Sequence, residues 1–312
     1  MIRSPSLSDD RLPDARPDNW VDRWAPAGLR PWLKLGRFDR PAGIWLLLLP
    51  GWQGVALADA ILGRLPDLKL LALIAVGATA MRAAGCAFND IVDRKMDAKV
   101  ARTAARPVAS GRISVAKAWA FLVGLSLVGL CALLCMNLTA ILLGVGSLAL
   151  VAAYPFMKRI TWWPQAWLGL TFNWGALLGY AAVRGQLDWP AGVLYASGIF
   201  WTLGYDTIYA VQDIEDDALA GVKSSARRLG SNVRNGVMAF YSLTILLLGG
   251  LTKFAPQGWP LLAAAALHLI WQSTQVKRED PQGALRLFKS NRDVGLLVFF
   301  ALAIAGWRRM HP

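Results

Sequence analysis

Two short acidic stretches contain the residues of this chain whose types and spacing best suit chemistry. In the first stretch, Asn89, Asp93 and Asp97 are four residues apart, so they lie along one face of a helix. In the second stretch, Asp213 and Asp217 have the same spacing. Stacked carboxylates repel one another, and Mg²⁺ removes that repulsion because it takes oxygen ligands from carboxylates and substrate phosphates. The two stretches therefore predict a magnesium site for a diphosphate.

Further acids accompany both stretches. Asp90 lies within the first stretch, Asp216 lies within the second, and Asp206 comes one to two helical turns before the second. Either stretch alone is equally typical of a solvated helix end whose acids pair with nearby Arg or Lys. Two such stretches on one side of a membrane favour the metal site.

Basic residues follow the acids closely. Arg102 and Arg106 come after the first stretch, Lys223 comes after the second, and Lys158 and Arg159 end a separate apolar run. Arg and Lys bind phosphate oxygens, and Arg also binds a carboxylate through two parallel hydrogen bonds. Each set alone is also what the positive charge of cytoplasmic loops would supply. Their occurrence beside the acids makes them candidates for binding a diphosphate.

These residues must be positioned by membrane-spanning helices. Of the 312 residues, 55% are hydrophobic and 17% are charged, whereas a soluble domain carries about a quarter charged residues. A spanning helix needs about 20 mostly apolar residues, and such segments run approximately over 41–61, 68–88, 114–134, 138–156, 164–183, 189–209, 236–253, 258–275 and 293–308. Close packing between these helices is expected at Gly85, Gly169, Gly175 and Gly179. The sequence therefore predicts an all-α, polytopic membrane protein with about nine transmembrane helices.

The distribution of charge predicts how the chain crosses the membrane. Lys and Arg total 33 against 20 Asp and Glu, which gives a net charge of +13. With a cytoplasmic N-terminus and nine spans, most Lys and Arg fall on the cytoplasmic side, as the positive-inside rule requires. Both acidic stretches also fall on that side, because they follow the second and the sixth segment. The expected partner is therefore a lipid bilayer and not a nucleic acid. As a separate expectation, the location is a bacterial inner membrane, with the N-terminus and the site facing the cytoplasm.

Residues 1–34 are expected to form a polar cytoplasmic extension, and residues 35–312 are expected to form the transmembrane domain. Within residues 1–31, Arg and Asp are equally frequent, whereas transit peptides are poor in acids, and no apolar signal segment is present. The three Cys lie in apolar runs, so a disulfide framework is excluded. The two His are too few for a histidine-rich metal site.

The two acidic stretches resemble the aspartate-rich motifs of the UbiA superfamily of intramembrane prenyltransferases. Other stretches are similar to its 4-hydroxybenzoate polyprenyltransferase branch: RFDRP (37–41), YPFMKRITWWPQAWLGL (154–170), GYDTIYAVQDIEDD (204–217) and FKSNR (288–292). The resemblance covers roughly residues 35 to 305. It implies a bundle of nine transmembrane helices whose active site opens to the cytoplasm and to lipid. The implied reaction is Mg²⁺-dependent transfer of a polyprenyl group from polyprenyl diphosphate to 4-hydroxybenzoate, ortho to its hydroxyl, in ubiquinone biosynthesis.

The resemblance also implies roles for individual residues. The implied ligands of Mg²⁺ are Asn89, Asp90, Asp93, Asp213, Asp216 and Asp217, with Asp97 in or beside the coordination sphere. The implied ligands of the diphosphate are Arg102, Arg106, Lys158, Arg159 and Lys223. Arg37 or another buried Arg would bind the acceptor carboxylate, with Tyr154 and Asn173 nearby. Asp206 would take the ring proton or orient the phenol, and the departing diphosphate is the alternative acceptor of that proton.

Arg82 is predicted to lie inside the second apolar segment. A charge at that depth is costly unless it faces a cavity or a partner. It lies two helical turns before Asn89 and shares its face, which favours a role near the acceptor. Snorkelling, or pairing with a backbone carbonyl, is the alternative.

Two other functions fit the same residues. A related prenyltransferase would use another aromatic acceptor, such as homogentisate or a naphthoate. Haem is a further alternative, but the scarcity of His argues against it. A secondary transporter would also have many spans and acids on one side. Transport sites usually lie near the membrane midplane on broken helices, whereas these acids lie at span ends beside cations. The sequence indicates neither the prenyl chain length nor the oligomeric state.

Overall fold

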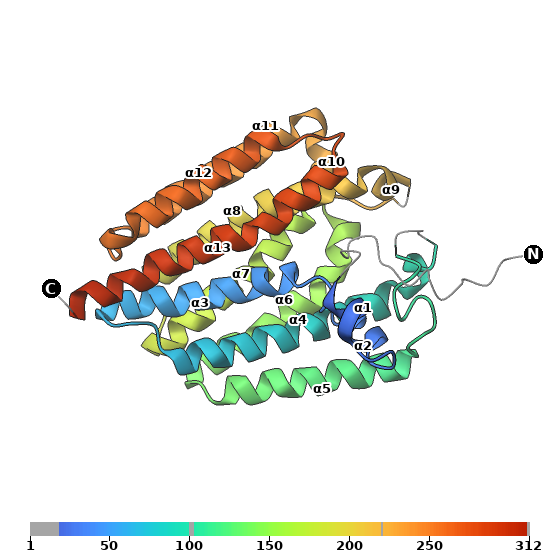
Figure 1. Ribbon diagram of the computed structural model, residues 1–312, viewed down its shortest axis with the longest axis horizontal. Coiled ribbons are helices and arrows are strands. Elements are labelled where there is room, and N and C mark those ends of the chain that lie inside the picture. Colours follow the sequence, from blue (N-terminus) through green and yellow to red (C-terminus); the bar gives the residue numbers. More distant parts are fainter. Residues whose placement is uncertain (1–18, 100–102, 220, 311–312) are drawn as a thin grey trace, which may run out of the picture. The chain divides into compact units, whose positions relative to one another are not determined.

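The computed structural model describes residues 19–99, 103–219 and 221–310, and over these ranges every regular element is a helix (Figure 1). The long helices are α3 (Ala42–Leu62), α4 (Leu68–Asp97), α5 (Val115–Leu134), α6 (Leu138–Ile160), α7 (Pro164–Arg184), α8 (Trp189–Ala210), α11 (Val233–Leu251), α12 (Trp259–Gln275) and α13 (Pro281–Met310). The short helices are α1 (Trp20–Trp24), α2 (Arg30–Leu35), α9 (Ile214–Leu219) and α10 (Ser225–Leu229), and the 3-10 turns are η1 (Val211–Asp213), η2 (Gly230–Asn232) and η3 (Pro256–Gly258).

Each predicted apolar segment coincides with one of these long helices. Within the described residues, five stretches are long and apolar enough to cross a membrane: α3, α4, α5, α6 and Ser225–Gly250, which contains α10 and most of α11. The protein is therefore an all-α membrane protein with several apolar helices. The count of nine spans and the orientation of the chain stay predictions.

The helix α4 is longer than the apolar segment that predicts it. It continues through the first acidic stretch to Asp97, although the apolar segment ends near residue 88. No Gly or Pro interrupts the helix after Gly85, and Arg94 and Lys95 lie in its last turn, where positive charge offsets the helix macrodipole. The first acidic stretch is therefore part of α4, which gives its acids the spacing of neighbours on one helix face.

The chain divides into two compact units. Of the described residues, the first unit contains those up to Ile44 and those within Val76–Cys131, and the second contains Trp45–Ala75 and those from Ala132 onward. A small core within the first unit consists of Leu35, Ala87, Ile91, Val108, Ile113 and Ala118. The first acidic stretch belongs to the first unit, and the second stretch belongs to the second. The domain boundary after residue 34, inferred from polarity, stays a prediction.

Glycines bring α3 and α7 close together in the second unit. A Cβ atom added at Gly54 would collide with the carbonyl oxygen of Ala176, and one added at Gly179 would collide with that of Gly51. A Cβ atom at Gly175 would lie 3.1 Å from the backbone nitrogen of Gly51. Backbones that approach this closely leave no room for side chains. The packing role predicted for Gly175 and Gly179 is confirmed.

The other two predicted packing glycines have opposite outcomes. A Cβ atom at Gly169 would lie 3.0 Å from the carbonyl oxygen of Ile199 on α8, so its packing role is confirmed. The prediction for Gly85 is wrong, because nothing in the described part of the chain lies within 4 Å of a Cβ atom built there. Gly85 therefore weakens α4 locally without allowing a closer contact.

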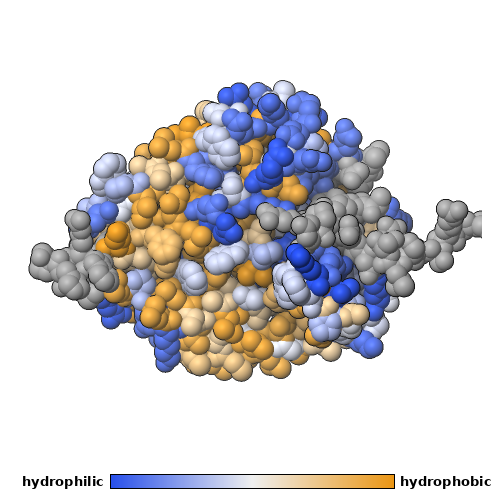
Figure 2. Space-filling model, viewed as in Figure 1, coloured by the Kyte–Doolittle hydropathy of each residue, from blue (hydrophilic) through white to orange (hydrophobic). Residues whose placement is uncertain are grey.

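Large apolar side chains remain exposed on several long helices. Leu127 and Leu134 on α5 and Leu138 and Leu142 on α6 are examples. Hydrophobic residues cover broad areas of the visible surface (Figure 2). Contiguous apolar surface of this extent is uncommon in soluble proteins and is typical of contact with a membrane.

Candidate active site

The first acidic stretch buries three carboxylates on the last turns of α4. Asp90, Asp93 and Asp97 are 0%, 1% and 6% exposed, and Asn89 beside them is half-buried. Burying a charge is costly unless the charge is paired, and the negative end of the helix macrodipole lies at this same end of α4. The stretch therefore requires cations close by.

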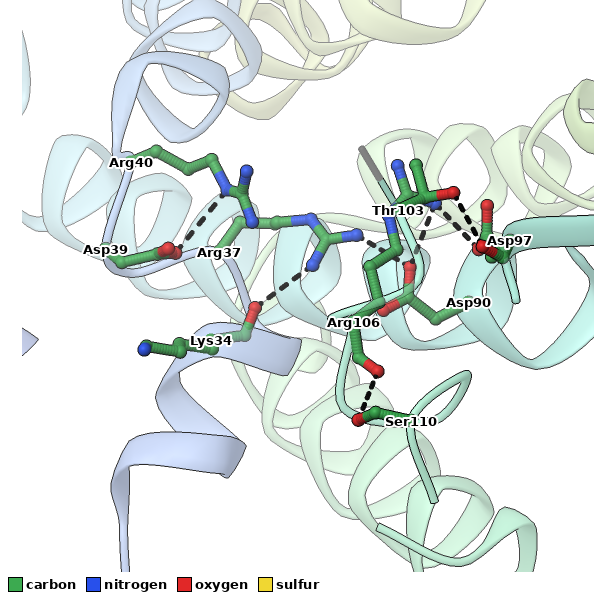
Figure 3. A network of polar contacts seen from close by, with 9 residues as sticks. All are labelled: Lys34, Arg37, Asp39, Arg40, Asp90, Asp97, Thr103, Arg106 and Ser110. Atoms are coloured by element: carbon green, nitrogen blue, oxygen red, sulfur yellow. Dashed lines mark hydrogen bonds and ion pairs between the residues drawn. The ribbon is translucent and has the colours of Figure 1, made fainter. Parts of the chain in front are cut away.

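Asp90 is paired with Arg37, which lies 53 residues earlier in the chain. Nη2 of Arg37 donates to Oδ1 of Asp90 at 2.6 Å (Figure 3). Nη1 of Arg106 lies 3.5 Å from the same oxygen. The second carboxylate oxygen of Asp90, Oδ2, is buried and has no hydrogen-bond partner among the residues that the structure describes. Asp90 therefore keeps one oxygen available for a further ligand.

Asp97 is also held by Arg106. Nη1 of Arg106 donates to Oδ2 of Asp97 at 2.8 Å. The hydroxyl of Thr103 donates to the backbone carbonyl of Asp97 at 3.0 Å, and the hydroxyl of Ser110 donates to the carbonyl of Arg106 at 2.8 Å (Figure 3). The first two bonds hold the loop after α4 against the helix end, and the third lies within the loop. One guanidinium thus lies between Asp97 and Asp90, which are two helical turns apart.

Arg37 has a backbone conformation that is rare for its residue type. Its φ angle is +61°, and no other non-glycine residue in the described ranges has a positive φ. A side chain in this region costs about 1–3 kcal/mol and persists where the surroundings impose it. Nη1 of Arg37 donates to the carbonyl of Lys34 at 3.1 Å, which helps to hold the turn. The turn aims the guanidinium at Asp90, whereas binding of an acceptor carboxylate by Arg37 stays a prediction.

Four charged residues before α3 were not singled out from the sequence: Asp22, Lys34, Asp39 and Arg40. Lys34 is buried and pairs with Asp22 at 2.6 Å. Asp39 is buried, and neither of its carboxylate oxygens has a hydrogen-bond partner in the described ranges. Burial raises the pKa of Asp39 against the opposing charge of Arg40, whose Nε lies 3.5 Å away. The RFDRP stretch could have indicated Asp39 in the sequence, but it contains neither Lys34 nor Asp22.

Arg82 lies against Gly43 at the start of α3, within the first unit. A Cβ atom added at Gly43 would lie 2.7 Å from Nη2 and 2.8 Å from Nε of Arg82. The absent side chain of Gly43 therefore makes room for the guanidinium. A role for Arg82 near the acceptor stays a prediction.

The second acidic stretch begins where α8 passes through the turn η1 into α9. Asp206 lies in α8 and Asp213 ends η1, and both side chains are half-buried. A 3-10 turn has about three residues per turn, so the acids do not continue the register of α8. Asp216 and Asp217 lie in α9, but their side chains fall outside the described part of the structure. Their roles as metal ligands stay predictions.

The segment after the second stretch is fixed to the end of α6 and the start of α7. The backbone N–H of Lys223 donates to the carbonyl of Lys158 at 3.0 Å, and that of Ser225 donates to Oε1 of Gln165 at 3.0 Å. Two predicted basic sets, one with Lys158 and one with Lys223, therefore lie side by side. Nζ of Lys223 donates to the carbonyl of Ile160 at 3.1 Å, so binding of a phosphate requires this ammonium to turn away.

The remaining predicted residues lie in different surroundings. Asn173 is buried, and its Nδ2 donates to the carbonyl of Gly169 at 2.9 Å and to the hydroxyl of Thr202 at 2.7 Å, which ties α7 to α8. Tyr154 is half-buried and packs against the hydrophobic core of the second unit. Arg159 is exposed at the end of α6, and Arg102 lies outside the described residues. Acceptor or diphosphate binding by these residues stays a prediction.

The donor atoms of the first stretch fit a hard cation. They are buried oxygens, and Oδ2 of Asp90 has no other partner in the described ranges. Mg²⁺ prefers such oxygen ligands and completes its shell with water and phosphate. The described residues alone do not assemble a closed site, since no group of three His, Cys, Asp or Glu among them is placed to hold an ion. Convergence of the two stretches on one diphosphate stays a prediction.

Long apolar helices, with buried acids and cations gathered at the end of α4, are typical of a polytopic membrane protein with a charged site. A sequence model described as the UbiA prenyltransferase family matches residues 47–304. The chain belongs to the UbiA prenyltransferase family.

Relatives named "4-hydroxybenzoate polyprenyltransferase, mitochondrial" are similar over most of the chain. The Bos taurus protein is 45% identical over 287 residues, which are 90% of this chain and 76% of the relative. The Homo sapiens protein is 45% identical over 293 residues, which are 91% of this chain and 78% of the relative.

Solved structures have the same fold. A UbiA homolog from Aeropyrum pernix K1, described as an apo structure, has a TM-score of 0.70 and 25% identity, covering 83% of this chain and 97% of that chain. A UbiA homolog from Archaeoglobus fulgidus, described as bound to GPP and Mg²⁺, has a TM-score of 0.65 and 20% identity, covering 88% and 99%. The second similarity supports the fold alone.

Proposed function

We propose that this protein transfers a polyprenyl group from polyprenyl diphosphate to 4-hydroxybenzoate, at the ring carbon ortho to the hydroxyl. The product is 3-polyprenyl-4-hydroxybenzoate, an intermediate of ubiquinone biosynthesis. The observation that carries the proposal is 45% identity, over about nine-tenths of the chain, to relatives named for this activity. The buried acids of α4 and the arginines that pair with them supply charges suited to a diphosphate and its metal.

We assign binding of the substrate diphosphate and its Mg²⁺ to the two acidic stretches and the basic residues that follow them. Mg²⁺ would be held by Asn89, Asp90, Asp93, Asp213, Asp216 and Asp217. When bound, Mg²⁺ supplies positive charge that neutralises the diphosphate and makes it a better leaving group. The UbiA homolog from Archaeoglobus fulgidus, whose fold this chain shares, is described as bound to GPP and Mg²⁺, and we propose the same ion here. Arg102, Arg106, Lys158, Arg159 and Lys223 would bind the remaining phosphate oxygens.

The prenyl transfer itself requires a dry site. The allylic C–O bond breaks, and its electron pair leaves with the diphosphate. The ring carbon ortho to the phenol hydroxyl then forms the new C–C bond, and the proton on that carbon passes to a base. Asp206, half-buried in α8, is the proposed base or the residue that orients the phenol. Exclusion of water prevents capture of the allylic cation, and the apolar spans provide that environment.

The acceptor is assigned to residues around the RFDRP stretch and α7. Arg37 or Arg82 would bind the carboxylate of 4-hydroxybenzoate, because Arg binds carboxylates through two parallel hydrogen bonds. Tyr154 and Asn173 would lie beside the ring. In the structure Arg37 is bonded to Asp90, so acceptor binding by Arg37 requires that pair to open.

The membrane location has a general and a specific part. The chain lies in a membrane, as its apolar helices require. We further propose that the N-terminus and both acidic stretches face the cytoplasm of a bacterial cell, because Lys and Arg are concentrated on that side of the predicted spans. The relatives above carry the word mitochondrial in their names, so the matrix side is the corresponding alternative.

The proposal is tested with the purified protein in detergent, Mg²⁺, a polyprenyl diphosphate and a panel of aromatic acceptors. We expect mass spectrometry to detect a prenylated product with 4-hydroxybenzoate and much less with homogentisate or a naphthoate. Preference for another acceptor would reject the substrate and keep the reaction class. Cation-driven uptake by proteoliposomes, with no prenylated product, would favour a transporter.

A further inference from the structure

Two arginines already occupy the carboxylates that a metal ion would need. Arg37 donates to Oδ1 of Asp90 at 2.6 Å, and Arg106 donates to Oδ2 of Asp97 at 2.8 Å while lying 3.5 Å from Oδ1 of Asp90 (Figure 3). Both acids are buried, and the arginines are largely buried. A cation that binds both oxygens of Asp90, or the bonded oxygen of Asp97, competes with these guanidinium groups for the same lone pairs and charge, even though Oδ2 of Asp90 has no hydrogen-bond partner of its own among the described residues.

The arginines compensate the negative charge of three buried carboxylates, which would otherwise destabilise the end of α4. Asp90, Asp93 and Asp97 place three carboxyl groups within two turns of α4, at the helix end where the macrodipole is negative. Unpaired charges in such a site would strongly destabilise the fold. Two guanidinium groups compensate most of this charge, so the unit can fold before metal binds.

Both arginines come from connections outside α4, and a connection can move without unfolding that helix. Arg37 lies between α2 and α3 in a left-handed conformation that only its surroundings impose. Arg106 lies in the loop after α4, which is tied by the hydroxyls of Thr103 and Ser110. Loss of the Arg37–Asp90 pair would release strain in the first of these connections.

We propose that Arg37 and Arg106 are internal counter-ions of the first acidic stretch, which a divalent cation displaces. The inference rests on the proposed function, because it takes Mg²⁺ as that cation. Displacement frees two guanidinium groups for anions beside the metal, which are the diphosphate and the acceptor carboxylate of the proposed reaction. Binding of Mg²⁺ and binding of these anions are therefore positively coupled through the two arginines. An anion offered without metal finds both arginines engaged.

The test measures binding of Mg²⁺ alone to the full chain in detergent at pH 8, by isothermal titration calorimetry and by thermal unfolding at increasing Mg²⁺. We expect Arg106→Gln and Arg37→Gln each to unfold at a lower temperature without metal. We also expect each to bind Mg²⁺ about tenfold more tightly, the effect of removing one competing charge-assisted hydrogen bond. Saturating Mg²⁺ should then restore most of the lost thermal stability.

Arg94→Gln is the matched control. Arg94 also lies near the end of α4, but its Nη1 donates to the backbone carbonyl of Ile91 at 2.8 Å and not to a carboxylate. Its replacement should leave the Kd for Mg²⁺ within twofold of the unmodified protein. Arg106→Lys, which keeps the charge, is the variant to use if Arg106→Gln does not fold, and it should bind Mg²⁺ with intermediate affinity.

Two results would overturn the inference. If the variants lose the same stability at every Mg²⁺ concentration and their Kd for Mg²⁺ is unchanged, the two arginines stabilise the fold but do not compete with the metal. Weaker Mg²⁺ binding in the variants would show that the arginines support the bound metal and do not compete with it. These measurements do not depend on turnover. A failed acceptor assay would therefore reject the proposed reaction and leave the counter-ion proposal to be tested by Mg²⁺ binding. Normal turnover together with an unchanged Kd for Mg²⁺ would reject the counter-ion proposal and keep the reaction.

Discussion

Arg106 lies nine residues beyond Asp97 and returns to it, with Nη1 of the arginine 2.8 Å from Oδ2 of the acid. Because Asp97 is the last residue of α4, this bond places a positive charge at the negative end of the helix macrodipole. The same guanidinium lies 3.5 Å from Asp90, so one side chain serves two buried acids. The end of α4 is thus a charge cluster built from three buried acids and cations supplied by two connections.

Replacement of one buried acid tests whether the cluster serves the reaction. We expect Asp93→Asn to lower prenyl transfer by about 10²-fold or more, the scale of effect seen when one electrostatic stabiliser is removed from an active site. The protein should still insert and unfold at a similar temperature, because the amide is isosteric with the carboxylate. The measurement is product formation by mass spectrometry, with thermal unfolding as the check on folding. Asp293→Asn, whose half-exposed side chain pairs with Arg292, should keep normal activity; near-normal activity of Asp93→Asn would reject the metal assignment.

The local features of this cluster could be predicted from the sequence, and its long-range pairs could not. Apolar runs and the four-residue spacing of Asp93 and Asp97 are local patterns, and the helix through both acids follows them. The bond from Arg37 to Asp90 joins residues 53 apart and depends on a φ angle of +61° that no local rule assigns to Arg. Spacing therefore identified the acids, and the alternative of pairing with nearby Arg or Lys agrees with the bond from Arg106 to Asp97, whereas nothing in the sequence indicated the pair of Arg37 with Asp90.

The same limit applies to the second stretch. The spacing of Asp213 and Asp217 predicts one helix that contains both acids, whereas Asp213 ends a 3-10 turn at Val211–Asp213 and Asp217 lies in α9. Whether the chain forms a 3-10 turn at this point depends on tertiary contacts. Here the bond between Thr207 and Ser225 hydroxyls, 2.6 Å apart, ties α8 to the segment beyond α9. Local propensity contains no information on that contact.

A buried polar network in the second unit should control stability. Asn291 accepts from Nε1 of Trp201 at 2.8 Å and donates to Oε1 of Gln272 at 3.2 Å, which links α8, α12 and α13. Asn291→Leu leaves buried polar groups without partners, at a cost of about 1–3 kcal/mol each. We expect a clear fall in the thermal unfolding temperature in detergent. Gln275→Leu, at an exposed position on α12, is the control, and an equal effect of both variants would contradict the role of the network.

The contact between α3 and α7 predicts opposite effects for two glycine substitutions. Gly54→Ala places a Cβ atom against the carbonyl oxygen of Ala176, and backbone cannot move aside as a side chain can. We expect destabilisation of about 1–3 kcal/mol or more from overpacking. Gly124→Ala on α5 meets nothing within 4 Å among the described residues, so it should stabilise the helix by about 0.5–1 kcal/mol. Thermal unfolding of both variants checks the difference, and a Gly54→Ala variant at least as stable as the unmodified protein would contradict the close packing of α3 against α7.

Two acids of the N-terminal region should respond to pH with opposite signs. Burial raises the pKa of Asp39. For Asp22, burial alone would raise the pKa, but hydrogen bonds from Lys34 and Asn19 outweigh burial and lower it below 3.8. A raised pKa means that the folded state holds its proton more tightly, so this contribution to stability falls as pH rises from 3.8 through the folded value. A lowered pKa contributes stability above 3.8 that is lost as pH falls through the folded value.

Asn substitutions separate the two cases. Asp39→Asn should be more stable than the unmodified protein at pH 7, and this advantage should disappear as the pH falls towards 3.8. Asp22→Asn should be less stable at pH 7, because it loses the 2.6 Å pair with Lys34, and its deficit should shrink in acid. Thermal unfolding of the three proteins between pH 3 and pH 8 provides the comparison. A stability of Asp39→Asn that parallels the unmodified protein at every pH would show that the Asp39 carboxyl is solvated, because a solvated carboxyl titrates alike in the folded and unfolded states.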